Sequence, residues 1–147
     1  MIDFTVTTRL DRPPIDVFSY VTDLALLPTW QAKAVSSVAD DGAPVGLGSR
    51  LREVHRAPGG KLIETVLEVC EYDPGRVFGL QAIEGTPIHL RIELQPELDG
   101  TSMRFTAYGS LPGFARIVEP LVAGMLRRQF RSDCARLQRL LAQQVVH

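Results

Sequence analysis

The closing stretch of the chain, Gly113 to Val145, is the feature that most restricts how this sequence can fold. Its apolar residues recur at a three-then-four spacing, which predicts one apolar stripe along a long amphipathic helix. Such a stripe needs a covering partner. Because the chain upstream is patterned mostly as β-strand, we expect a sheet that curves around the helix. The stripe includes Ile117, Val118, Leu121, Val122, Met125, Leu126, Phe130, Cys134, Leu137, Leu140 and Leu141, and the opposite face carries Arg116, Arg127, Arg128, Arg131, Arg136 and Arg139.

The chain before that helix divides into one strand, two short helices and six further strands. Ile2 to Leu10 alternates apolar and polar residues, which indicates a half-buried strand. Pro13 and Pro14 end it and suit the first turn of a short helix to about Thr22, and a second short helix or turn lies before Trp30. Short turns indicate antiparallel pairing, so we predict an α+β fold with a seven-stranded sheet, in the order β-α-α-β6-α. The six later strands are expected at Ala34–Ala39, Ser49–Arg56, Lys61–Tyr72, Arg76–Ile83, Pro87–Gln95 and Thr101–Gly109.

Two residues inside the closing stretch disturb its helical pattern. A proline in a helix interior costs about 3 kcal/mol unless it lies in the first turn. We therefore expect a short helical turn at Phe114 to Glu119, an interruption, and a main helix from about Pro120. Gly124 either allows close approach of the sheet or a ligand, or is simply a tolerated small residue. The stretch from Gln129 onward is expected to pack in the core.

Five short motifs occur along the chain in a fixed order. They are Arg12-Pro13-Pro14-Ile15-Asp16-Val17-Phe18, Asp23-Leu24 through Pro28-x-Trp30, Val45-Gly46-Leu47-Gly48-Ser49-Arg50, Glu71-Tyr72-Asp73-Pro74-Gly75-Arg76 and Asp99-Gly100-Thr101. Together they resemble the START-like or Bet v 1-like (helix-grip) superfamily, in its polyketide cyclase/dehydrase and lipid-transport branch. The resemblance covers essentially the whole chain. One departure is Asp99, which stands where the family pattern has glycine.

The resemblance implies a helix-grip fold, in which a curved antiparallel sheet grips the C-terminal helix around an apolar cavity. Residues 1–147 would then form a single START-like ligand-binding domain. Members of the superfamily bind lipids, sterols, polyketides, flavonoids or hormones, and some are aromatase/cyclases. The fold alone does not choose among these functions.

Side-chain parity along the strand Ser49 to Arg56 selects candidate catalytic residues. Burying the arginines of one face is far less favourable than burying one Glu and one His that can pair, so Leu51, Glu53 and His55 are predicted to point inward. A histidine beside a carboxylate can act as a general acid or base. The alternative is a satisfied pair near the end of the sheet, where it meets water. Tyr108 is a third candidate if a bulge turns it toward the rim of the cavity.

The remaining ligand contacts are expected on the inner face of the sheet and on the closing helix. Trp30 is expected mainly to pack the two short helices onto the sheet, with some contact to the cavity. The full set of predicted ligand-binding residues is Trp30, Leu51, Glu53, His55, Leu67, Phe78, Leu80, Leu90, Ile92, Phe105, Val118, Val122 and Met125.

Composition and motifs argue against several classes of protein. The net charge is −1, which gives no general case for nucleic acid, and a solvated arginine face paired with Asp133 and neighbouring acids is expected. No phosphate loop, dinucleotide fingerprint or metal-binding motif occurs, so neither cofactor nor metal is predicted. Cys70 and Cys134 are expected to be small buried residues. No stable membrane insertion and a cytoplasmic location are expected.

Three functional interpretations remain open. The first is a carrier that binds an apolar small molecule or lipid-like ligand in the cavity. The second is a polyketide cyclase or dehydratase-type enzyme that uses His55 with Glu53, and Tyr108 as a further candidate. The third is an assembly partner, in which a sheet edge or the apolar residues near Leu111 to Leu121 form a homodimer contact.

Overall fold

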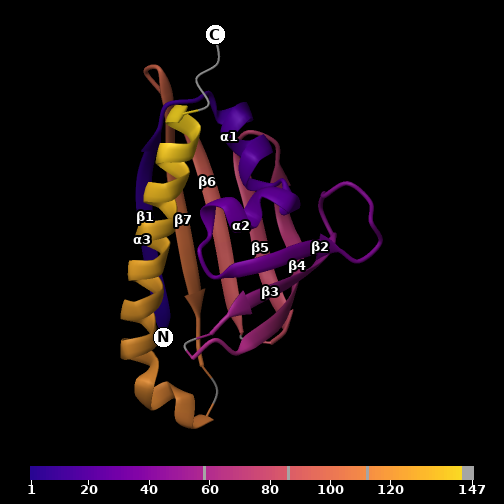
Figure 1. Ribbon diagram of the computed structural model, residues 1–147, viewed down its shortest axis with the longest axis vertical. Helices are drawn as coiled ribbons and strands as arrows, with labels where there is room; N and C mark the ends of the chain where they lie inside the picture. The colour runs from indigo at the N-terminus through magenta and orange to yellow at the C-terminus, as the bar shows by residue number, and fades with distance from the viewer. Residues whose placement is uncertain (58, 86, 112, 144–147) are drawn as a thin grey trace.

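The computed structural model describes residues 1–57, 59–85, 87–111 and 113–143. These residues form a seven-stranded antiparallel sheet of order β1-β7-β6-β5-β4-β3-β2, which curves around one long helix (Figure 1). The predicted α+β helix-grip fold and its element order are confirmed. The strands are β1 (Ile2–Leu10), β2 (Ala34–Ala39), β3 (Arg50–Arg56), β4 (Leu62–Asp73), β5 (Val77–Glu84), β6 (Ile88–Glu97) and β7 (Gly100–Gly109). The helices are α1 (Pro14–Val21), η1 (Leu24–Leu26), α2 (Leu27–Trp30), η2 (Gly113–Val118) and α3 (Glu119–Gln143).

The first strand and first helix follow directly from their local sequence. In β1, Ile2, Phe4, Val6 and Leu10 are buried, whereas alternate residues face outward. Pro14 is the first residue of α1, where its missing N–H leaves no helical hydrogen bond unmade.

The sheet brings the two ends of the chain together. β1 pairs with β7 along its whole length, from Ile2 opposite Gly109 to Leu10 opposite Thr101. The turn before β7 places Asp99 at a φ of 60°, in the left-handed region that favours glycine but that aspartate tolerates. This explains why an aspartate can stand at the position where the family pattern has glycine.

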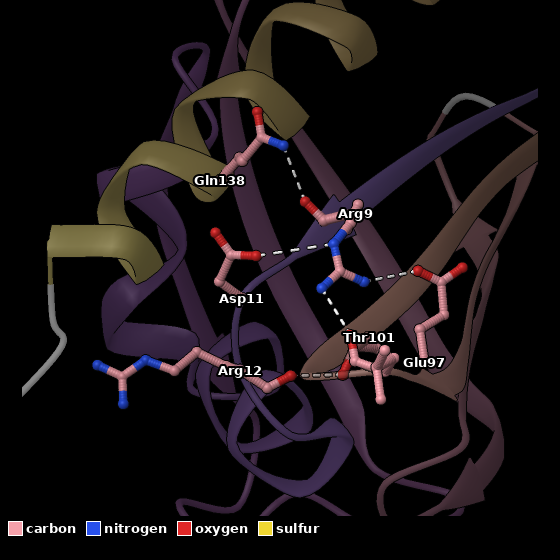
Figure 2. A network of polar contacts seen from close by, with 7 residues as sticks. Arg9, Asp11, Arg12, Glu97, Thr101 and Gln138 are labelled. Carbon is pink, nitrogen blue, oxygen red and sulfur yellow. Dashed lines mark hydrogen bonds and ion pairs between the residues drawn. The ribbon is translucent and has the colours of Figure 1, made fainter.

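The C-terminal half of α3 is held on β1 by packing and by polar clamps. Cys134, Leu137 and Leu141 are at most 2% exposed. Gln138 Nε2 donates to the backbone oxygen of Arg9 at 2.9 Å, and the Arg9 guanidinium pairs with Glu97 at 2.8 Å (Figure 2). This clamp joins α3, β1 and the β6–β7 turn.

Arg12 extends the same clamp through both its backbone oxygen and its side chain. Thr101 Oγ1 donates to the Arg12 oxygen at 2.6 Å, as Figure 2 shows, while Arg12 Nε donates to the Leu141 oxygen at 3.2 Å. Arg12 near the start of the chain and Thr101 in β7 therefore help to fix the C-terminal end of α3 at Leu141.

The N-terminal part of the closing stretch departs from the predicted single stripe. The interruption comes between Val118 and Glu119, where the 3-10 helix η2 gives way to α3, so Pro120 lies in the first turn of α3 as expected. Ile117 and Leu121 are 80% and 79% exposed, so the stripe is not covered here. A Cβ at Gly124 would meet open space, which favours the tolerated-residue interpretation over close approach. The predicted helix end at Val145 lies outside the described residues.

Candidate functional site

A cavity of about 240 Å³ lies between the inner face of the sheet and α3. α3 packs chiefly along β1, at one edge of the sheet, so this helix does not cover the more distant strands, and α1 contacts β6 instead (Figure 1). We call this space the main cavity. Its lining residues are Gln31, Lys33, Glu53, His55, Arg56, Ala57, Ile63, Thr65, Leu67, Ile88, Leu90, Phe105, Met125, Leu126, Gln129, Phe130 and Asp133.

A smaller inner cavity of about 30 Å³ adjoins the main one. The two share Gln31, Glu53, Leu90 and Phe105, so Glu53 faces both. The other lining residues of the inner cavity are Val21, Leu24, Leu27, Trp30, Phe78, Leu80 and Ile92. Most of the combined surface is aliphatic or aromatic, as expected of a site for an apolar ligand.

The predicted inward pair on β3 lies on the wall of the main cavity. Glu53 is 5% exposed, and its Oε1 lies 3.8 Å from His55 Nε2. Leu51 precedes them on the same face, while Arg50, Arg52 and Arg56 are exposed, so the strand has the parity that the sequence argument predicts.

Burial sets the protonation of this pair. It raises the pKa of the Glu53 carboxyl to about 7, an effect only partly opposed by Ser37, whose Oγ donates to Glu53 Oε2 at 3.2 Å. Burial also lowers the pKa of His55. Both shifts favour neutral side chains. Near neutral pH the cavity therefore presents a carboxylic acid that can donate a proton beside an imidazole that can accept one.

A second buried acid faces the main cavity from α3. Asp133 is 3% exposed, and its Oδ1 accepts a hydrogen bond from the Ala32 N–H at 3.1 Å. Burial raises the pKa of this carboxyl to about 6. The contact ties the middle of α3 to the segment between α2 and β2. Asp133 thus closes one side of the cavity, on a different wall from the one that carries Glu53.

Trp30 contributes a polar donor without an acceptor. Its side chain is 1% exposed, lines the inner cavity and packs 6.0 Å from the ring of Phe105. The indole Nε1 is buried and has no hydrogen-bond partner among the described residues. Buried donors are nearly always paired, so this N–H lacks the partner that such a group normally has. Trp30 thus packs in the core, as predicted, and also contacts the cavity.

Most of the predicted ligand contacts gather around the two cavities, and some do not. Trp30, Glu53, His55, Leu67, Phe78, Leu80, Leu90, Ile92, Phe105 and Met125 line one or both. Leu51 is fully buried in the core instead. Val118 and Val122 are also not among the lining residues. Val118 is instead 48% exposed, and Val122 is partly buried against the core.

Tyr108 is the largest correction. No bulge interrupts β7 there, so Tyr108 keeps the parity opposite to Phe105 and points to the outer face of the sheet. Its ring stacks on His89 with centroids 4.4 Å apart, and His89 Nε2 lies 3.4 Å from Cys70 Sγ. The structure therefore does not bring Tyr108 together with Glu53 and His55.

Asp133, Gln31 and Lys33 are among the cavity residues that sequence reasoning missed. The expectation that Asp133 belongs to the solvated arginine face is wrong, because its side chain points inward to Ala32. A signal was present: Asp133 follows Phe130 by three residues and precedes Leu137 by four, so it lies on the buried side of the helix. Gln31 and Lys33 lie in a loop whose path depends on the tertiary fold.

The described residues offer neither a metal cluster nor a membrane-spanning helix. Their His, Cys, Asp and Glu side chains form no group of three or more that could hold a metal ion. Within the described ranges, no helix combines the length and apolar character needed to cross a membrane.

The architecture and the cavity together define a class of protein. A curved antiparallel sheet that grips a C-terminal helix, with a cavity between them, is the helix-grip arrangement. The chain belongs to the family described as polyketide cyclase / dehydrase and lipid transport, whose model matches residues 1–142. A search of curated proteins found no match.

Solved structures show the same fold at low sequence identity. A Thermus thermophilus protein is 21% identical with a TM-score of 0.82, covering 98% of this chain and 99% of that one. A Nitrosomonas europaea protein is 19% identical with a TM-score of 0.77, covering 97% and 95%. A Rhodobacter sphaeroides protein is 16% identical with a TM-score of 0.76, covering 97% and 93%. At these identities the likeness establishes the fold alone.

Proposed function

We propose that this protein binds a small apolar molecule, with at least one hydrogen-bonding oxygen, in the cavity between the sheet and α3. The observation that carries the proposal is a mostly apolar cavity with buried polar groups, Glu53 and Trp30, on its walls. Apolar walls supply affinity, and a few polar groups fix orientation. A ligand oxygen that accepts from Trp30 Nε1 would satisfy a donor that is otherwise unpaired.

The volume limits the size of the ligand. An engineered apolar cavity of about 150 Å³ is enough for benzene, so the 240 Å³ of the main cavity suits a compound of one or two rings, or a short aliphatic chain. Burying about 200 Å² of apolar ligand surface contributes roughly 5 kcal/mol. Association itself costs at least about 4 kcal/mol. The hydrogen bonds are therefore needed for useful affinity.

The charges around the cavity favour a neutral ligand over a carboxylate. Glu53 and Asp133 are the buried ionisable acids on its walls, whereas the cations Lys33 and Arg56 are exposed at its rim. A carboxylate inside would lose its hydration and face these acids without a buried cation to pair with. A phenol, alcohol or ketone avoids that penalty.

A titration with matched probes tests this proposal. We expect saturable one-to-one binding of N-phenyl-1-naphthylamine, displaced at least tenfold more effectively by 2-naphthol than by 2-naphthoate at about pH 8, where Glu53 is mostly ionised. Leu90→Trp should fill the shared wall of both cavities and weaken probe binding at least tenfold. Ile83→Trp, on a half-exposed side chain outside both cavities, is the matched control and should bind as the wild type does. Equal binding by both variants would exclude the cavity as the site.

A second candidate function is acid–base catalysis on the bound molecule. It is favoured by the Glu53–His55 pair, whose carboxyl has a pKa of about 7 and whose imidazole is held neutral by burial. Glu53 would protonate a ligand oxygen while His55 accepts a proton from a neighbouring position, as enolisation or dehydration of a hydroxy-ketone requires. His55→Ala should then abolish turnover of a hydroxy-ketone and spare probe binding. Unchanged turnover would exclude His55 as a catalytic residue, and ligand binding would remain as the proposed function.

A further inference from the structure

The closing stretch carries an exposed apolar surface that neither the fold nor the cavity uses. Ile117, Val118, Leu121 and Met125 are 80%, 48%, 79% and 44% exposed, and we call these four residues the apolar tip. Ile117 and Val118 are the last two residues of η2, and Leu121 and Met125, four residues apart, lie on one side of the start of α3. In Figure 1 this segment projects beyond the ends of the strands, at the bottom of the view. Single exposed aliphatic residues are ordinary, but a contiguous group marks an interaction site.

The exposed charges beside the apolar tip are of one sign. The stretch from Gly113 to Gln143 contains six arginines and only two acids, Glu119 and Asp133. Both acids are 3% exposed and turned into the protein: Glu119 Oε2 accepts from the Leu111 N–H at 3.2 Å, and Asp133 accepts from Ala32. The solvent-facing side of this stretch is therefore cationic, although the whole chain has a net charge of −1.

The arginines nearest the apolar tip flank it on both sides. Arg116 precedes Ile117 directly, and Arg127 and Arg128 follow Met125 within one turn; all three are exposed. In the part of the chain that the structure describes, none of them forms an ion pair with an acidic side chain. Arg127 and Arg128 therefore have no acidic partner among the described residues, whereas Arg116 lies near Glu119, whose pKa is lowered chiefly by the N-terminal ammonium and to a smaller extent by Arg116.

The apolar tip is also continuous with the cavity. Met125 belongs to the tip and lines the main cavity together with Leu126, its neighbour on α3. A surface that contacts the tip therefore lies beside the main cavity.

We propose that the apolar tip and its flanking arginines form a docking surface for an anionic lipid bilayer. Apolar side chains at a helix end, bordered by arginine, are the chemistry of a segment that lies in the headgroup region without spanning the membrane. Each arginine near an anionic surface strengthens binding by about fivefold, the equivalent of roughly 1 kcal/mol. This inference goes beyond ligand binding and does not depend on which molecule occupies the cavity.

The same features fit a second copy or a nucleic acid less well. A standard protein interface uses about 20–30 residues on each side, whereas the tip has four, and two cationic faces would repel each other. Base stacking needs exposed aromatic side chains, and Phe130, the one aromatic side chain that the structure describes between residues 113 and 143, is buried.

Vesicle co-sedimentation tests the docking surface directly. The full chain should bind vesicles of phosphatidylcholine with phosphatidylglycerol, bind phosphatidylcholine alone at least tenfold more weakly, and release from the anionic vesicles at about 1 M salt. Ile117→Asp with Leu121→Asp should reduce binding more than tenfold, and Arg127→Glu with Arg128→Glu should do the same. Leu98→Asp is the matched control, because Leu98 is 88% exposed in the β6–β7 turn at the opposite end of the sheet, and it should bind like the wild type.

Several results would overturn the docking surface. Equal binding to both vesicle types, no binding at all, or loss of binding in Leu98→Asp as well would each contradict it. A wild type that elutes as a dimer in size-exclusion chromatography, with Leu121→Asp as a monomer, would assign the tip to a second copy instead. Leu90→Trp, which should block the cavity, is expected to keep vesicle binding, so failure of ligand binding and failure of docking are separate observations.

Discussion

The two halves of α3 share one sequence pattern but face different surroundings. In the second half, Phe130, Cys134, Leu137 and Leu141 are buried, and the clamp around Arg9 and Arg12 holds this half in place (Figure 2). Between Glu119 and Met125, by contrast, Leu121 and Met125 are exposed, and Val122 is only partly buried against the core. The comparison shows that an apolar stripe in the sequence identifies the helix face that can pack against a sheet. It does not show that the whole face is buried.

Phe130 marks the border between the two halves. Its ring stacks on Phe105 with centroids 4.3 Å apart, meets Phe4 edge-on at 5.0 Å, and lines the main cavity. Packing beyond this ring supplies stability, and the space before it supplies the candidate site. The protein thus separates stability from the proposed binding role along a single helix.

The largest expected effect comes from truncating equivalent leucines in the two halves. Leu137 is fully buried, so Leu137→Ala should lower the free energy of unfolding by about 4 kcal/mol through lost packing and a cavity. Leu121→Ala, on a side chain that is 79% exposed, should change it by less than about 0.5 kcal/mol. Urea denaturation of both variants measures the difference. A similar loss of unfolding free energy in both variants would contradict the distinction between the two halves of α3.

Glu53→Gln tests the wall of the cavity. A carboxyl whose folded pKa is raised stabilises the fold fully below its unfolded pKa, and that contribution is lost as pH rises through the folded pKa. For Glu53 the window runs from 4.5 to about 7. Glu53→Gln should therefore be more stable than the wild type at about pH 8, by about 3 kcal/mol at most, and nearly equal at about pH 4. Denaturation curves at the two pH values measure this, and a variant equally stable to the wild type at both would contradict the burial of an ionising acid.

Asp133→Asn tests the border of the two halves with a smaller expected effect. The pKa of Asp133 is raised from 3.8 to about 6, so its contribution to stability is present below the lower value and lost as pH rises through the higher one. The asparagine keeps an acceptor for the Ala32 N–H. Because the pKa shift is smaller than that of Glu53 and the charges of Arg136 and Lys33 favour the ionised form, we expect a gain of about 1 kcal/mol above about pH 6 and none at low pH. Thermal melts across that range measure it, and a loss of stability at high pH would show that the charge itself is needed.

Gly124→Ala should have the smallest effect, and in the stabilising direction. A Cβ there meets no atom within 4 Å, so alanine should add about 0.5–1 kcal/mol by helix propensity alone. Probe binding should be unchanged. A loss of probe binding on this substitution, measured in the same titration, would restore the interpretation that Gly124 allows a ligand to approach.

The fold was predictable because its signals are local. Alternation in β1, the prolines before α1 and the glycine-rich turns each fixed an element to within a residue or two, and their order left few topologies. The inward parity of Glu53 and His55 followed from the unfavourable burial of arginine on the other face.

The site was predictable only in part because it depends on where α3 ends its contact with the sheet. The exposure of Leu121 and the path of Gln31 and Lys33 into the cavity are set by tertiary placement, which spacing does not encode. The burial of Asp133 could have been predicted from its helical spacing to Phe130 and Leu137. Its charge instead favoured the prediction of a solvent-exposed side chain. Tyr108 depended on a bulge that β7 does not contain.

Native mass spectrometry of protein purified without detergent tests the central claim, that the space under the first half of α3 is a ligand site. We predict an adduct of a small neutral molecule on the wild-type chain and on the Ile83→Trp control. The adduct should be absent from Leu90→Trp, whose new side chain occupies the cavity. An adduct that survives Leu90→Trp, or a wild type that binds no 2-naphthol when it is added, would contradict the account.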